Sequence, residues 1–160
     1  AACIRICTWG EFQDKTSGKK FFFFNTHMDH VGVVARRESA QLILKSISQL
    51  TMGLPTILTG DFNVDQTDEI YQIFSNSGIL HDCYTNAQQR MAPTGTWNDF
   101  MQDSRSKSRI DHIFVTRDFD VLHYAIFTNS YWLDKSRRNI SDHYPVMVKL
   151  SYSKNKTLQK

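Results

Sequence analysis

The chain has 160 residues, of which 41% are hydrophobic and 22% charged, and its formal net charge is +3. This length allows one domain with its own core, and the composition is that of a globular protein. The three lysines after Tyr152 account for this net charge, so residues 1–152 are neutral overall. A neutral body argues against a protein that holds nucleic acid mainly by bulk charge. The cysteines have neither zinc-site spacing nor the even number of a disulfide framework.

No apolar run approaches the roughly 18 residues that span a bilayer. No signal peptide is visible either. The sequence starts with Ala1 and enters a strand-like segment at once, which predicts that it is a piece of a longer protein. The sequence does not indicate the compartment of that protein. A flexible tail is expected over residues 153–160.

In chain order, alternating apolar residues first predict a strand over residues 2–9. A Ser-Gly turn leads to a second strand, FFFFNTH, whose four phenylalanines predict burial on both faces. The two strands are expected to form an antiparallel hairpin. Apolar residues at helical spacing then predict a helix over 33–51, ended by Gly53 and Pro55.

A short buried strand, PTILTG, follows this helix, and a second helix is expected over 67–77. Residues 84–108 are predicted to form a long loop, and residues 129–141 a basic polar loop. Strands are expected at RIDHIFVT, DFDVLHYAIFT and HYPVMVKLSY. This order predicts an α/β (α+β) fold with a mixed sheet and helices on one face. Because the other face would be bare, part of the domain is expected to be missing.

Four motifs place polar side chains at strand ends: NTHMDH (25–30), GDFN (60–63), RIDHIF (109–114) and SDH (141–143). Such side chains commonly form the ligand site of an α/β sheet. Asp and Asn supply hard oxygen ligands that suit Mg²⁺ or Mn²⁺ better than zinc. Hydrolysis of a phosphate ester needs such an ion, a base for water and donors for the phosphoryl oxygens. The motifs therefore favour phosphoester chemistry.

In this order and spacing, the four motifs resemble the endonuclease/exonuclease/phosphatase (DNase I-like) superfamily over about residues 1–150, and within it a bacterial subgroup of family hydrolases. The resemblance implies that residues 1–152 form the C-terminal half of a two-sheet α/β sandwich and supply roughly one of its sheets. It also implies a divalent-metal-dependent phosphoesterase with Mg²⁺ or Mn²⁺ as cofactor. The substrate would be a nucleic acid, a phospholipid head group, an inositol phosphate or a small phosphodiester.

The resemblance further implies roles for the matching residues. His27 would hydrogen-bond a phosphoryl oxygen, and His143 would be the general acid/base. Asp111 would orient His143, and we expect a direct hydrogen bond of about 2.6–3.2 Å between them. The alternative partner for Asp111 is the nearby Arg109 or the backbone. Three residues would orient the attacking water or hold the metal: Asp61, Asn63 and Asp142. These side chains are expected to converge at one edge of a sheet.

The family also uses a glutamate metal ligand and an asparagine from its N-terminal half, and no matching segment is present. Glu11, Glu38 and Glu69 stand in the wrong contexts. The chain alone is therefore expected to be weak or inactive, and a non-catalytic binding or structural fragment is the alternative. The expected partners are the missing half of the domain and a second copy, which would cover an exposed apolar sheet face.

Five residues outside the central set are candidate substrate contacts: Arg36, Trp97, Phe100, Arg109 and Arg138. Charged loops are usually only solvated, but a position beside the site favours contact with substrate phosphates. The two aromatic residues could stack on a substrate or simply pack. These alternatives stay open.

Overall fold

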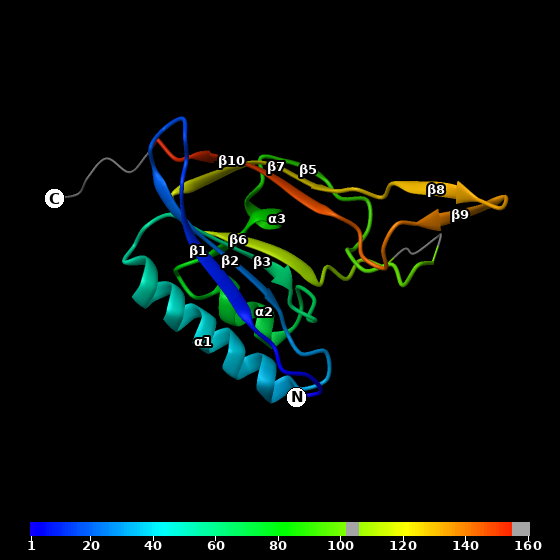
Figure 1. Ribbon diagram of the computed structural model, residues 1–160, viewed down its shortest axis with the longest axis horizontal. Helices are drawn as coiled ribbons and strands as arrows, with labels where there is room; N and C mark the ends of the chain where they lie inside the picture. Colours follow the sequence, from blue (N-terminus) through cyan, green and yellow to red (C-terminus); the bar gives the residue numbers. More distant parts are fainter. Residues whose placement is uncertain (102–105, 155–160) are drawn as a thin grey trace.

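The computed structural model describes residues 1–101 and 106–154, so residues 155–160 of the predicted tail lie outside the described part. Within it, the strands form a five-stranded sheet, a three-stranded sheet and a separate two-stranded ribbon (Figure 1). The predicted α/β class is confirmed, but the strands divide between two sheets rather than entering one. No helix among these residues is long and apolar enough to cross a membrane.

The first sheet has the order β1-β2-β3-β6-β4. Its strands are β1 (Cys7–Gln13), β2 (Lys20–His27), β3 (Thr56–Asp61), β4 (His81–Asp82) and β6 (Asp111–Val115). The predicted β1–β2 hairpin is confirmed as antiparallel, although β1 begins later than expected. Strands β2 and β3 run parallel and β6 runs antiparallel to β3. The carboxyl ends of β2 and β3 and the start of β6 therefore meet at one edge.

Two helices cover one face of this sheet (Figure 1): α1 (Val33–Thr51), which matches the prediction, and α2 (Glu69–Ser75), which is shorter than predicted. Ile43 and Ile47 of α1 are buried in one core with Phe22 and Phe24 of β2. The phenylalanine run is thus fully buried on this face only. Phe21 and Phe23 point the other way and are half-buried, so the expectation of burial on both faces is wrong for this part of the chain.

The second sheet, of order β10-β7-β5, packs against the opposite face of the first, so the expectation of a bare face is wrong for this part of the sheet. It consists of β5 (Gln89–Met91), β7 (Phe119–Ile126) and β10 (Val146–Tyr152). Ile113 and Val115 of β6 form a second core with Tyr124 and Ile126 of β7. The short helix α3 (Cys83–Asn86) and β5 lie in the segment predicted to be a plain loop. The sheet face beside β10 is less covered: Phe12, Phe21 and Leu150 line a cavity of about 460 Å³ there.

The predicted basic loop over 129–141 is instead a ribbon of β8 (Ser130–Leu133) and β9 (Ser136–Asn139) that extends away from the body (Figure 1). Its turn residues, Asp134 and Lys135, have φ of 48° and 62°. Two successive positive φ values fit the right-handed twist of a hairpin, but Asn-Gly is the usual sequence there. The Asp-Lys pair therefore gave no hairpin signal.

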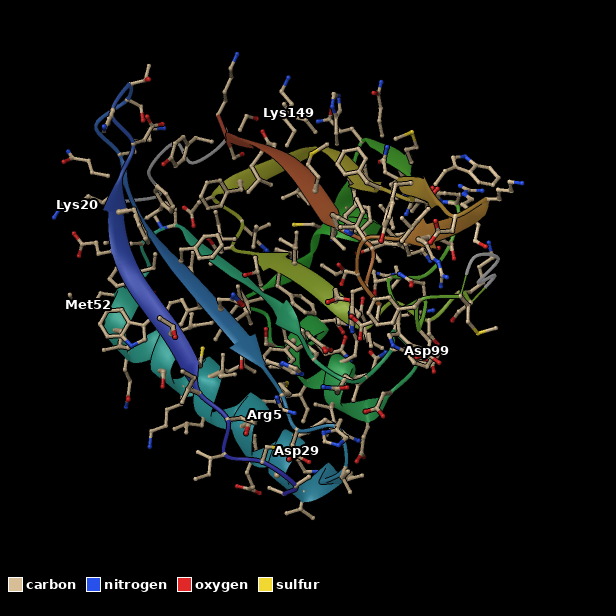
Figure 2. The ribbon with its side chains drawn as sticks, turned by 45° about the vertical axis from the view of Figure 1, so that its right-hand side comes forward. Arg5, Lys20, Asp29, Met52, Asp99 and Lys149 are labelled. Carbon is tan, nitrogen blue, oxygen red and sulfur yellow. The ribbon has the colours of Figure 1, made fainter. Side chains whose placement is uncertain are left out.

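The carboxylate of Asp29 fastens the N-terminal segment to the loop before α1 (Figure 2). It accepts hydrogen bonds from the backbone N–H groups of Ala2 (2.7 Å), Cys3 (3.0 Å), Val31 (2.9 Å) and Gly32. The N–H groups of Gly32 and Cys3 contribute most to holding the pKa of this carboxyl well below its ordinary value. Asp29, for which the sequence indicated no role, closes this loop.

The folded protein should therefore lose stability as the pH falls through the ordinary aspartate range, because the unfolded chain takes up the Asp29 proton first. Asp29→Asn should lower Tm by a few degrees at pH 7, since an amide N–H₂ would face backbone N–H donors. It should also flatten the fall of Tm between about pH 5 and pH 3. Thermal unfolding followed by circular dichroism measures both effects. Asp134→Asn, at the exposed ribbon turn, is the control that removes one surface carboxylate, and its Tm at pH 7 should match that of the wild type.

Candidate active site

Three of the predicted residues form a row across neighbouring strands. His27 ends β2 and pairs in register with Asp61, which ends β3; Asp61 in turn pairs with Asp111, which begins β6. Strand register alone thus sets an imidazole and two carboxylates side by side at one sheet edge. The side-chain atoms agree, because His27 Nε2 lies 3.2 Å from Asp61 Oδ2.

Gly60 permits this close approach. Its φ is 153°, and a Cβ there would lie 1.9 Å from the carbonyl oxygen of Thr26. Any other residue would push β3 away from β2 immediately before Asp61. The glycine of the GDFN motif therefore has a steric role that fixes the position of the carboxylate.

His143 reaches the row from the loop before β10. Its Nδ1 lies 2.8 Å from Asp111 Oδ2, which confirms the predicted hydrogen bond and excludes Arg109 as the partner of Asp111. An ionised carboxylate can only accept, so Nδ1 carries the proton. In the neutral imidazole, Nε2 is then the basic nitrogen, and it lies 3.9 Å from Asp61 Oδ2.

The charges of these groups act on one another. Burial raises the pKa of Asp61 above its ordinary value, the N–H of Asn63 opposes this, and the nearby Asp111 raises it further. Partial burial disfavours a charged His143, but the hydrogen bond to Asp111 and the charges of Asp111 and Asp61 outweigh it, so the pKa of His143 is raised. Excess negative charge at Asp61 and Asp111 would be relieved by a cation.

The donor set fits such a cation. Among the described residues, Asp61, Asp111 and His143 form a group whose potential ligand atoms all lie within 4.8 Å of one another. They line a cavity of about 510 Å³ together with Asn25, the first residue of the NTHMDH motif, and Thr59, which precedes GDFN; the sequence predicts no role for either. Carboxylate oxygens in an open cavity are suitable for Mg²⁺ or Mn²⁺.

The other two predicted metal residues occupy the rim of this group. The backbone N–H of Asn63 donates to Asp61 Oδ1 (2.8 Å), and its side-chain amide donates to the carbonyl of Met28 (2.9 Å). Asp142 is half-buried beside His143, and its Oδ1 accepts from the hydroxyl of Ser141 (3.2 Å). Both lie at the predicted edge, but their metal-binding roles stay predictions.

Two of the candidate substrate residues are corrected. Arg109 is buried, its Nη1 lies 3.3 Å from Asp82 Oδ2, and its guanidinium lies 3.7 Å from the ring centre of Tyr84. Arg36 is buried as well, and its Nη1 donates to the carbonyl of Asp29 (2.8 Å). Neither guanidinium is available to a substrate, because each is buried and bonded to other groups of the protein.

The remaining candidates are exposed. Trp97 forms an isolated backbone bridge with His143, which places it beside the site. Phe100 is exposed nearby in sequence, and Arg138 is exposed on β9. These positions are compatible with substrate contact, which stays a prediction.

Sequence comparison decides the family to which this geometry corresponds. Residues 7–143 match the profile described as the Endonuclease/Exonuclease/phosphatase family. The chain belongs to this family. The match spans all four motifs, from NTHMDH to SDH, and so confirms the resemblance from which their roles were inferred.

Solved structures of the family superpose closely on the chain. A mannosyl-6-phosphatase of Bacteroides thetaiotaomicron is 47% identical, with a TM-score of 0.90 over 92% of this chain and 57% of that one. A family protein of Bacteroides vulgatus is 35% identical, with a TM-score of 0.85 over 96% of this chain and 57% of that one. These superpositions confirm the DNase I-like fold class.

Among curated proteins, Nocturnin of Mus musculus is 30% identical over 111 residues, which cover 64% of this chain and 26% of that protein. The chain thus spans little more than half the length of the family structures and about a quarter of the curated relative. Family membership is established over most of the chain, whereas the activity of the whole protein is a matter for proposal.

Proposed function

We propose that the chain carries the acid–base pair and part of the metal site of a divalent-metal-dependent phosphoesterase. The observation that carries the proposal is the 2.8 Å hydrogen bond between His143 Nδ1 and Asp111 Oδ2, beside Asp61. An imidazole oriented by one carboxylate and facing a second is suited to remove a proton from water. The family acts on phosphate esters, which require this proton transfer.

In the proposed mechanism, water attacks the phosphorus, the P–O bond to the ester group breaks, and the alkoxide leaves and takes a proton from solvent. His143 Nε2 accepts the proton of the attacking water, while Asp111 keeps Nδ1 protonated and stabilises the imidazolium that forms. His27, which is exposed and held beside Asp61, donates to a phosphoryl oxygen. Asp61, with Asn63 beside it, orients the water. A bound Mg²⁺ or Mn²⁺ would neutralise phosphoryl charge, and Asp61, Asn63 and Asp142 are the residues proposed to hold it.

We also propose that residues 1–152 are the C-terminal part of the catalytic domain and that a further glutamate ligand comes from outside this sequence. In support, two glutamates are committed elsewhere: Glu11 pairs with Lys20, and Glu69 with Arg37. The partly covered face beside β10 would then receive the rest of the domain, or a second copy in the chain alone. The assignment to a bacterial hydrolase subgroup stays a prediction.

For the substrate, we propose a phosphorylated sugar, because the relative named a mannosyl-6-phosphatase is 47% identical over most of the chain. Exposed Trp97 and Phe100 would contact its non-reacting part, and Arg138 would attract its charge. Nucleic acid is disfavoured by the neutral body of the chain.

A substrate panel tests the proposal. The longest protein that contains this sequence, and the 160-residue chain itself, would be assayed for phosphate release from mannose 6-phosphate and for cleavage of bis(p-nitrophenyl) phosphate and an RNA oligonucleotide, each with Mg²⁺ and Mn²⁺. We expect the longer protein to prefer the sugar phosphate, with weak activity or none in the chain alone. Preference for RNA would overturn the substrate class. No hydrolysis by the longer protein would leave the non-catalytic binding fragment as the better account.

A further inference from the structure

A short segment, residues 96–98, lies between the two elements that carry Asp111 and His143. The side-chain oxygen of Thr96, which has 0% exposure, accepts hydrogen bonds from the backbone N–H groups of Ile110 (2.9 Å) and Asp111 (3.0 Å). This fixes the first residue of β6, and with it the backbone from which the Asp111 carboxylate projects.

Asn98 performs the equivalent task for the turn that carries His143. Its backbone N–H donates to the carbonyl of Asp142 (2.7 Å), and its side-chain Nδ2 donates to the carbonyl of Ser141 (3.1 Å). The residue is 1% exposed, so these bonds form away from water, where an unmade one would be costly. The turn is thus held at two consecutive carbonyls by one buried residue.

The side-chain oxygen of Asn98 also has hydrogen-bond partners. Asn98 Oδ1 accepts from the N–H of Phe100 (2.8 Å) and from Nδ2 of Asn139 (3.1 Å), and that Nδ2 also donates to the carbonyl of Met101 (2.8 Å). The orientation of the Asn98 amide is therefore determined, because a flipped amide would point N–H₂ at two donors. Its Nδ2 must face Ser141.

The segment also runs alongside the His143 backbone. Trp97 and His143 form a backbone bridge, and the N–H of Tyr144 donates to the carbonyl of Thr96 (2.7 Å). One stretch of three residues thus contacts both the start of β6 and the turn before β10. The 2.8 Å distance between His143 Nδ1 and Asp111 Oδ2 depends on the relative position of the start of β6 and the turn before β10.

We propose that Asn98 is a positioning residue: by holding the Ser141 and Asp142 carbonyls, it keeps His143 Nδ1 directed at Asp111. Its importance for catalysis rests on the proposed function, in which His143 is the base. The predicted effect of Asn98 on the orientation of the His143 ring does not rest on the proposed function, because that orientation is a property of the folded chain. Displacements of about 1 Å at such a group cost about 100-fold in rate.

Two substitutions separate this role from general packing. Asn98→Ala removes every side-chain bond of the residue. Asn98→Asp keeps the shape and the acceptor for Phe100 and Asn139, but it has no donor for the Ser141 carbonyl. Asn86→Ala is the matched control. Asn86 lies on α3, away from the site, and its Nδ2 also donates to a backbone carbonyl, that of Asp82 (2.9 Å).

The readout is the tautomer of neutral His143, measured in the ¹⁵N-labelled 160-residue chain from two-bond couplings between ring nitrogens and carbon-bound protons at alkaline pH. His143→Gln assigns the signals. We expect the Nδ1–H form in the wild type and in Asn86→Ala, and a shift to a mixture rich in Nε2–H in both Asn98 variants. In an active longer protein, Asn98→Asp should lower kcat by about 100-fold with little change in KM.

Retention of the Nδ1–H form in a folded Asn98→Ala or Asn98→Asp protein would overturn the proposal. Failure of both variants to fold would overturn it too, since Asn98 would then support the whole fold rather than His143. The tautomer measurement uses no substrate. An inactive longer protein would therefore count against the proposed function while leaving this result standing.

Discussion

If the proposed function is right, replacing His143 with alanine should lower kcat of the longest active protein that contains this sequence by about 10²–10⁴-fold, the usual contribution of a positioned general base. The variant keeps Asp61 and Asp111, so phosphate and metal can still be bound, but no imidazole remains to take the proton from water. The reason is structural: His143 Nε2 lies 3.9 Å from Asp61 Oδ2, beside the proposed water site. Steady-state phosphate release with saturating sugar phosphate measures the effect.

The matched control is His123→Ala. His123 is exposed in the middle of β7, on the second sheet, and pairs in register with Lys149. Its loss should leave kcat within about twofold, since it touches none of the reacting groups. Wild-type turnover in His143→Ala would remove the base from the mechanism, and an equal loss in both variants would mean that the assay reports folding rather than catalysis.

Replacing Arg109 with methionine should have the largest effect on stability, about 3–5 kcal/mol out of the 5–15 kcal/mol typical of a domain. The substitution leaves the carboxylate of Asp82 buried without its cation, although Tyr71 still donates to it (2.7 Å). The guanidinium also loses its contact with the ring of Tyr84. Urea unfolding followed by fluorescence gives the free energy of unfolding.

Arg37→Met provides the comparison, because Arg37 also pairs with a carboxylate, that of Glu69, but on the surface. The two side chains are 38% and 63% exposed. Such pairs contribute about 0–1 kcal/mol. If both variants lose the same small amount, the buried pair is not a major source of stability and the structural role assigned to Arg109 is wrong.

The row of His27, Asp61 and Asp111 was predictable because each member lies at the end or the start of a strand that its own segment specifies. GDFN ends a buried apolar run and RIDHIF begins one, so their carboxylates had to stand at strand ends. The structure adds the register, which sets Asp61 opposite Asp111. The bounds of helix α1 were also predictable, because Gly53 and Pro55 end the helix whatever surface it packs against.

The buried arginines could not be predicted from local pattern. A positive charge indicates exposure, and Arg109 lies inside only because Asp82, 27 residues earlier in the chain, is there to pair with it. Arg36 lies at a buried helix position, whereas the apolar Val34 and Leu42 of the same helix are exposed. Which helix face is covered depends on the sheet beneath, and helical periodicity alone did not identify it.

Asn98 escaped notice for a related reason. The stretch TWND has no motif and no hydrophobic period, so the sequence predicts only a loop there. Its function comes from contacts across 43 positions, with the Ser141 carbonyl, which no local rule records. Polar residues buried by long-range hydrogen bonds are the class that a single sequence leaves hidden.

In the proposed function, the site of Asp61, Asp111 and His143 hydrolyses phosphate esters with the help of a divalent cation. The most direct test is phosphate release by the longest protein containing this sequence, measured first with Mg²⁺, then after chelation with EDTA and dialysis, and finally with Mg²⁺ or Mn²⁺ restored. We expect activity that disappears on chelation and returns with either cation. Undiminished activity in the chelated protein would contradict it.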